Sequence, residues 1–84
     1  MYRYNTNVFI ERVNDELVVH NNDTKKTYFL NETASTIFQS IKNSNMEELL
    51  SVLSSKYEAS QEELYNDTNE IVAELMNYGL IYEE

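Results

Sequence analysis

Adjacent carboxylates are the most frequent groups in this sequence that could do chemistry. Glu47-Glu48, Glu62-Glu63 and Glu83-Glu84 form pairs, and Glu70 and Glu74 are one helical turn apart. Acid–base catalysis needs two carboxylates that converge in a cleft with separated pKa values. These pairs instead fall in the first turns of predicted helices or at the chain end, where negative charge is stabilising or solvated. They therefore do not predict catalysis, and Glu70 with Glu74 has no evident third ligand for a cation.

Other catalytic and metal-binding groups are scarce. The 84 residues include no cysteine, one histidine (His20) and one glycine (Gly79). The absence of cysteine excludes disulfides, cysteine-ligated zinc, iron–sulfur clusters and thiol catalysis. A single histidine excludes a multi-histidine metal site, and a single glycine excludes a glycine-rich phosphate loop. We therefore expect no enzyme, no cofactor and no metal, with His20 as a surface or cross-strand residue.

The charge of the chain is strongly acidic. It has 15 acidic and 6 basic residues, for a net charge of −9, and Lys25-Lys26 is the only basic cluster. Nucleic acid and anionic membranes need a basic surface, so both are disfavoured as partners. The apolar runs are too short to span a bilayer, and the N-terminus lacks the apolar core of a signal peptide. We expect a single cytoplasmic domain over residues 1–84.

The first part of the chain predicts a small antiparallel sheet. Residues 8–13, 16–20 and 27–30 are short runs rich in β-branched and aromatic side chains, separated by polar turns. Asn14-Asp15 suits a tight turn because both residue types tolerate left-handed backbone geometry. A three-stranded meander leaves an open edge of unpaired N–H and C=O groups. An extended peptide can join such an edge as a further strand.

The second part of the chain predicts three helices. Asn31 is a good N-cap for the first, and Ser44 with Glu47 and Ser60 with Glu63 form capping-box patterns for the second and third. Gly79 supplies the positive φ that ends helices, and residues 80–82 are expected to pack on the core as an apolar tail.

The third helix carries more apolar surface than one contact requires. At about 100° per residue, its main stripe spans roughly 80°, and further residues widen the arc to roughly 160°. The main stripe is Leu64, Thr68, Ile71, Leu75 and Tyr78, and the further residues are Tyr65, Val72 and Met76. Either the helix is buried on two sides, or the second stripe lines a groove beside the open strand edge.

Several motifs in sequence order together resemble one known family. They are Thr27-Tyr28-Phe29-Leu30-Asn31 with Thr33-Ala34 and Ile37-Phe38, Glu47-Glu48-Leu49 with Leu53 and Tyr57, and Asp67-Thr68 with Ile71-Val72, Leu75 and Gly79-Leu80-Ile81. Their order and spacing resemble the PqqD-like family, also called the RiPP recognition element, over residues 8–81. Thr68 stands where the family has an aliphatic residue, and the turn before the third strand lacks the family's usual glycine.

The resemblance implies an α+β, winged-helix-like fold, with a three-stranded antiparallel sheet followed by three helices. It implies a stand-alone protein that binds the leader segment of a ribosomally made precursor peptide by β-strand addition. The partner would be a modifying enzyme, such as a radical-SAM enzyme or a leader peptidase, in a lasso-peptide, radical-SAM or PQQ-type pathway. The implied peptide-binding residues are Lys25, Lys26, Thr27, Tyr28, Phe29 and Leu30 at the strand edge, with Tyr65, Asn69, Val72 and Met76 as the helix wall.

Some alternatives stay open. Lys25 and Lys26 could pair with acidic leader residues, or they could only protect an exposed strand edge from aggregation. A winged-helix DNA-binding regulator is the rival function, although residues 61–78 contain no Lys or Arg and would repel phosphates. A structural dimer, or a weak homodimer, could also form through the open strand edge.

Overall fold

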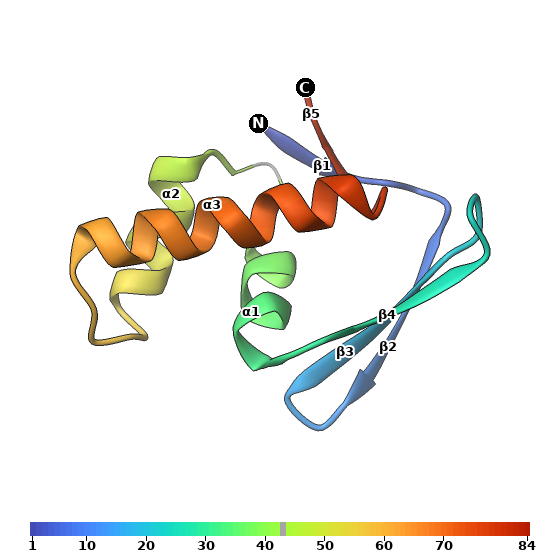
Figure 1. Ribbon diagram of the computed structural model, residues 1–84, viewed down its shortest axis with the longest axis horizontal. Helices are drawn as coiled ribbons and strands as arrows, with labels where there is room; N and C mark the ends of the chain where they lie inside the picture. The colour runs from blue at the N-terminus through green and yellow to red at the C-terminus, as the bar shows by residue number, and fades with distance from the viewer. Residues whose placement is uncertain (43) are drawn as a thin grey trace.

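Two antiparallel sheets and three helices make up residues 1–42 and 44–84, the part of the chain that this computed structural model describes (Figure 1). One sheet has the strand order β2-β3-β4, and the other pairs β1 with β5. The elements in chain order are β1 (Tyr2–Tyr4), β2 (Val8–Val13), β3 (Glu16–Asn21), β4 (Lys26–Leu30), α1 (Glu32–Ser40), α2 (Met46–Ser54), α3 (Gln61–Asn77) and β5 (Ile81–Glu83).

The meander β2-β3-β4 confirms the predicted three-stranded sheet. Asn14 has a φ of 59°, as expected for the tight turn between β2 and β3, and Lys25 has a φ of 63° in the turn before β4. Side chains alternate along β3, so that Leu17 and Val19 are buried against the helices while Val18 and His20 lie on the other face. Only one face of the sheet therefore packs against the helices.

The small sheet of β1 and β5 is absent from the sequence prediction, which assigned residues 80–82 to an apolar tail. The two strands pair at opposite ends of the chain, with Tyr2 opposite Glu83 and Tyr4 opposite Ile81. The Tyr4 hydroxyl donates to the Phe38 carbonyl oxygen, and the two rings stack with centroids 4.8 Å apart. Strands of three residues carry too short a pattern to be recognised without the tertiary pairing.

The predicted helix starts hold at two of three positions. The side chains of Asn31 and Ser60 cap α1 and α3, as expected. The Ser44 cap predicted for α2 is wrong, because the Asn45 side chain accepts from the Glu48 N–H at 2.9 Å. The Ser44 hydroxyl instead donates to the Ser40 carbonyl oxygen at 3.0 Å. The capping pattern is therefore real but begins one residue later.

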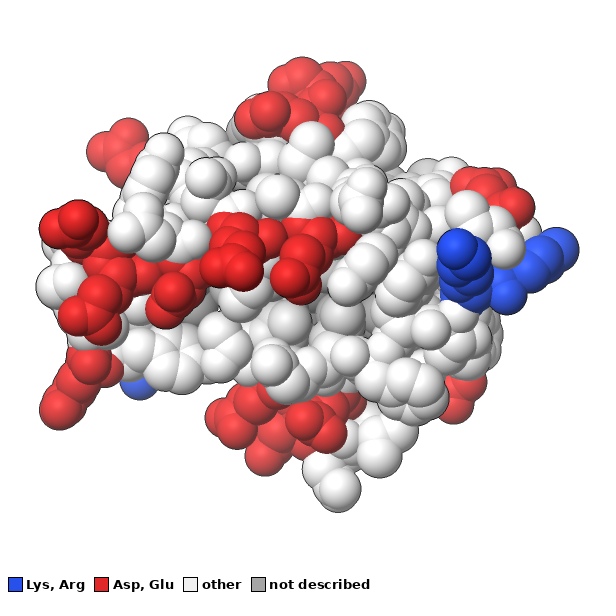
Figure 2. All heavy atoms as spheres, in the orientation of Figure 1, with Lys and Arg blue, Asp and Glu red and all other residues white. Residues whose placement is uncertain are grey.

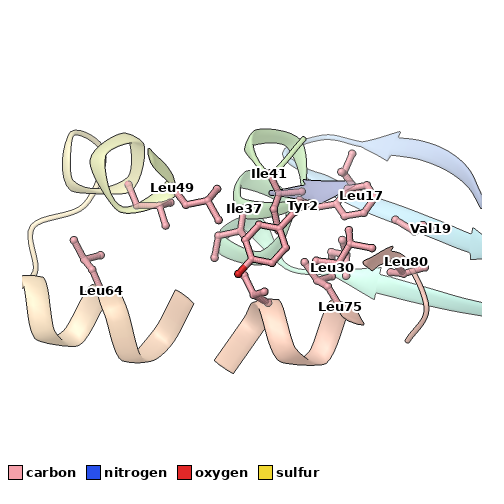
Figure 3. Close-up of a cluster of buried hydrophobic side chains, with 14 residues drawn as sticks. Tyr2, Leu17, Val19, Leu30, Ile37, Ile41, Leu49, Leu64, Leu75 and Leu80 are labelled. Carbon is pink, nitrogen blue, oxygen red and sulfur yellow. The ribbon is translucent and has the colours of Figure 1, made fainter. Parts of the chain in front are cut away.

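One hydrophobic core joins the three helices to both sheets. Figure 3 shows side chains from α1, α2 and α3 meeting those of β1, β3 and β4. Leu49 and Ile41 are fully buried, and Tyr2 brings the small sheet into the same cluster. The position of each element thus depends on the others.

Two buried polar side chains connect the sheet to the helices. The Ser35 hydroxyl accepts from the Leu17 N–H at 2.9 Å and donates to the Leu30 carbonyl oxygen at 3.0 Å. Asn21, which is 2% exposed, donates from Nδ2 to the Tyr78 carbonyl oxygen at 2.9 Å. Its Oδ1 accepts from the Asp23 N–H at 2.9 Å. These links hold α1 and the end of α3 at fixed positions against β3.

Replacing Asn21 with Ala is expected to lower the free energy of unfolding by about 1–3 kcal/mol, because buried main-chain groups lose their partner. Urea denaturation followed by circular dichroism measures the change. Asn22→Ala, at the adjacent exposed position, serves as the control and should stay within about 0.5 kcal/mol of the parent. Equal effects of the two substitutions would contradict the proposed link.

Asp23 is expected to make stability pH-dependent. Hydrogen bonds from the amides of Asn5 and Asn7 lower the pKa of this carboxyl group in the folded state. A depressed pKa stabilises the fold above the ordinary pKa of Asp, and the contribution is lost as the pH falls through the folded pKa. Asp23→Ala should therefore lower Tm at neutral pH, with a difference that shrinks below about pH 4. A constant difference at all pH values would contradict this, and Asp15→Ala at an exposed turn position is the matched control.

Candidate functional site

The outer edge of β4 is open, because β4 pairs with β3 alone among the described strands. In Figure 1, β4 is the strand of this sheet nearest α3. The Ser35 hydroxyl lies between the Leu17 N–H and the Leu30 carbonyl, so these main-chain groups face each other. Antiparallel ladders alternate, so the N–H and C=O groups of Thr27 and Phe29 point to the open edge.

The neighbouring ladder gives the same alternation independently. The Asn22 N–H donates to the Asn7 carbonyl oxygen at 3.0 Å, across the β2–β3 pairing. Even-numbered residues of β3 therefore direct their main-chain groups toward β2 and odd-numbered ones toward β4. Opposite the even-numbered Val18 and His20 lie Phe29 and Thr27, whose main-chain groups face away from β3. The open edge thus offers two residues for pairing with another strand.

One aromatic contact shows which side of α3 borders β4. The rings of Tyr28 on β4 and Tyr78 at the end of α3 stack, with centroids 4.1 Å apart and an angle of 14°. At about 100° per residue, Asp67, Ile71 and Glu74 share a helix flank with Tyr78. We call this side the β4-facing flank of α3.

A hollow of about 290 Å³ lies between α1, the end of α2 and the first half of α3. Its apolar lining includes Ile37, Leu53 and Leu64, and Glu58 and Asp67 add two carboxylates. The hollow begins close to the end of β4, since Thr33 lines it three residues after Leu30. The remaining lining residues are Tyr57, Ala59 and Thr68. The open edge and this hollow together form an extended site.

The helix wall predicted from the sequence lies elsewhere. Val72 is 3% exposed and belongs to the core, so its expected place on an exposed wall is wrong. Tyr65 and Met76 are 48% and 40% exposed, and Asn69 is also exposed, but all three lie on the flank opposite Tyr78. The structure therefore does not bring these four residues together with β4.

Tyr65 instead lies near the small sheet. Burial, Glu83 and Tyr65 together raise the pKa of Tyr2 on β1. The wide apolar arc of α3 therefore arises partly from packing on two sides, one of the two interpretations that the sequence left open. At the sheet edge, Lys25 lies in the turn before β4, and Lys26 and Thr27 are exposed. Phe29 is 81% exposed, whereas Leu30 is buried.

A second hollow, of about 410 Å³, lies away from β4. It is lined by residues of β1, the segment after it, β2 and β5, with Lys42 from the segment that follows α1. In residues 1–42 and 44–84, no cluster of three or more His, Asp or Glu side chains could hold a metal ion. None of the described helices combines the length and apolar character needed to cross a membrane.

Comparisons with known proteins agree with this geometry. The family model of coenzyme PQQ synthesis protein D (PqqD) matches residues 16–81. A solved structure of TbiB1 in complex with the TbiA(beta) leader peptide has a TM-score of 0.88 and 19% identity, covering 98% of this chain and 99% of that one. A lasso peptide synthetase B1 complexed with the leader peptide has a TM-score of 0.85 and 19% identity, covering 98% of both chains. No curated protein sequence matches. The two structures share the fold of this chain.

Val72→Glu is expected to abolish the cooperative thermal transition or to lower the free energy of unfolding by about 3–5 kcal/mol, because it buries an unpaired charge. Tyr65→Glu changes an exposed residue of the same helix and should keep the transition. Differential scanning calorimetry measures both variants. A folded Val72→Glu protein with unchanged Tm would contradict the core position of Val72.

Proposed function

This chain belongs to the PqqD family, and we propose that it binds the leader segment of a ribosomally synthesised precursor peptide and presents that peptide to a modifying enzyme. The leader adds to β4 as a further antiparallel or parallel strand. The open edge of β4, beside an apolar hollow on the same side of α3, is the observation that carries this proposal. The leader peptides in the two complexes of similar fold support it.

Main-chain pairing gives the first part of the proposed recognition. The outward N–H and C=O groups of Thr27 and Phe29 bond to the leader backbone, and such bonds tolerate varied leader sequences. Side chains of an added strand alternate between the two faces of the sheet. Those on the helix side reach the β4-facing flank of α3 and the hollow, which select the leader by shape and polarity.

The proposed role is delivery rather than catalysis. A bound leader holds the rest of its precursor near the partner enzyme and so raises the effective concentration of the segment to be modified. The proposed role needs only a surface that binds the leader, and it needs no reactive group. The partner enzyme is a radical-SAM enzyme or a leader peptidase, and we place the process in the cytoplasm.

A DNA-binding role is disfavoured by the charge of the helix that would have to contact the duplex. α3 (Gln61–Asn77) contains five acidic and no basic residues. Its surface would repel phosphates instead of displacing their counterions. The edge of β4 is therefore better suited to a peptide than the helix is to nucleic acid.

Phe29→Pro tests the main-chain pairing, with Phe29→Ala as its matched control. Both variants lack the exposed ring, but only proline also removes the outward N–H. An edge position with an outward N–H tolerates proline. The probe is a synthetic leader of the precursor peptide encoded nearest the gene, and isothermal titration calorimetry measures its affinity. We expect Phe29→Pro to bind at least about tenfold more weakly than Phe29→Ala. Equal affinities would refute strand addition at this edge.

An NMR titration of labelled protein with the same leader maps the site. Shifts are expected in Lys26–Leu30 and at Asp67, Ile71 and Tyr78, because these residues border the open edge. Tyr65 and Met76 serve as internal controls, since they lie on the opposite flank. Shifts confined to Tyr65 and Met76 would favour the helix wall expected from the sequence and would count against the β4-facing flank.

A further inference from the structure

A row of acidic residues runs along the exposed side of α3, next to the β4-facing flank. Four of the five acidic residues of this helix fall within an arc of roughly 60° at 100° per residue. They are Glu63, Asp67, Glu70 and Glu74. Figure 2 shows acidic side chains as a band across this face of the molecule, over the position of α3 in Figure 1. Asp67 and Glu74 of this row lie on the β4-facing flank, whereas Glu63 and Glu70 lie farther round the helix toward solvent.

No basic side chain of the protein neutralises this row within the described residues. The ion pairs there join Arg3 to Glu84 and Glu11 to His20, and neither involves α3. Glu63 with Asp67, and Glu70 with Glu74, are like charges one helical turn apart, an arrangement that destabilises a helix. The fold therefore keeps an unfavourable charge pattern on the exposed side of α3, and two of its members, Asp67 and Glu74, border the open strand.

The hollow near the end of β4 also carries negative charge. Its apolar lining is interrupted by the carboxylates of Glu58 and Asp67. By contrast, Lys25 and Lys26 lie in and after the turn at the opposite end of β4, and Figure 2 shows Lys and Arg side chains at that side of the molecule, with some basic surface also visible at the other end. A peptide along β4 thus meets the carboxylates of Asp67 and Glu74 on its helix side and that of Glu58 at the hollow.

We propose that the leader bound here is cationic, with a large apolar side chain in the hollow and Lys or Arg at alternate positions facing α3. This rests on the proposed function and names the chemistry of its peptide. Alternate residues of an extended strand are about 6.7 Å apart, and residues seven apart in a helix rise by about 10.5 Å. Long Lys or Arg side chains at alternate leader positions can therefore reach both Asp67 and Glu74. Acidic leaders are rejected by the same row.

Selection from a displayed library of random peptides tests the proposal with a probe that assumes no leader sequence. We expect the selected peptides to carry Lys or Arg at alternate positions beside a large apolar residue. A synthetic copy of one selected peptide is then titrated against two double variants. Asp67→Asn with Glu74→Gln should weaken binding at least about tenfold at low salt. Glu47→Gln with Glu48→Gln removes the same charge from exposed positions of α2 and should leave the affinity within about twofold.

The outcomes separate this proposal from the function on which it rests. Selected peptides that require the Phe29 N–H but lack basic residues would overturn the cationic leader and leave strand addition intact. An unchanged affinity in the Asp67/Glu74 variant would also overturn it. If no selected peptide discriminates Phe29→Pro from Phe29→Ala, the proposed function itself fails, and the cationic leader fails with it. These amide substitutions relieve like-charge repulsion, so loss of folding does not confound the test.

Discussion

The buried amide of Asn21 is the interaction on which the geometry of the site depends. Helix ends leave carbonyl groups without intrahelical partners, and Asn21 donates to the carbonyl of Tyr78 just where α3 stops. Gly79 follows with a φ of 74°, and a Cβ there would lie 2.9 Å from the Asn21 amide nitrogen. A side chain at position 79 would therefore have to displace the buried Asn21 amide and adopt a positive φ, so the close approach of the ends of β3 and α3 favours glycine. This contact sets the position of α3 relative to the whole sheet.

A fixed helix explains why the edge of β4 can stay open. The first half of α3 packs on α1 and α2 through Leu64 and neighbouring core residues, while its end is held at β3 by Asn21. At the second attachment, β4 meets the end of α3 through the stacked rings of Tyr28 and Tyr78. Open edges promote aggregation, and natural proteins protect them with short strands and charged residues. Here β4 has five residues, begins at Lys26, and lies in a protein with a net charge of −9.

The sequence predicted those parts of the fold that local pattern controls. The β-rich runs at residues 8–13 and 16–20 and the caps at Asn31 and Ser60 are properties of short segments, and the structure confirms these strands and caps. The pairing of β1 with β5 depends on residues about eighty positions apart, and three-residue strands leave little periodic signal. Adjacent residues that can both cap a helix, Ser44 and Asn45, left the start of α2 uncertain by one position. The periodic pattern of α3 likewise could not predict which of its flanks borders β4. Periodicity gives the width of an apolar arc but not which side faces the sheet, although the one-sided row of acidic residues was visible in the sequence.

Amide hydrogen exchange at Thr27 and Phe29 tests strand addition most directly, because it reports on the main-chain groups that a bound leader would cover. Saturating leader peptide should slow exchange at these two amides strongly. It should change Tyr28 much less, because the N–H of Tyr28 already faces β3. A leader that binds tightly while Thr27 and Phe29 continue to exchange as in the free protein would contradict strand addition at β4.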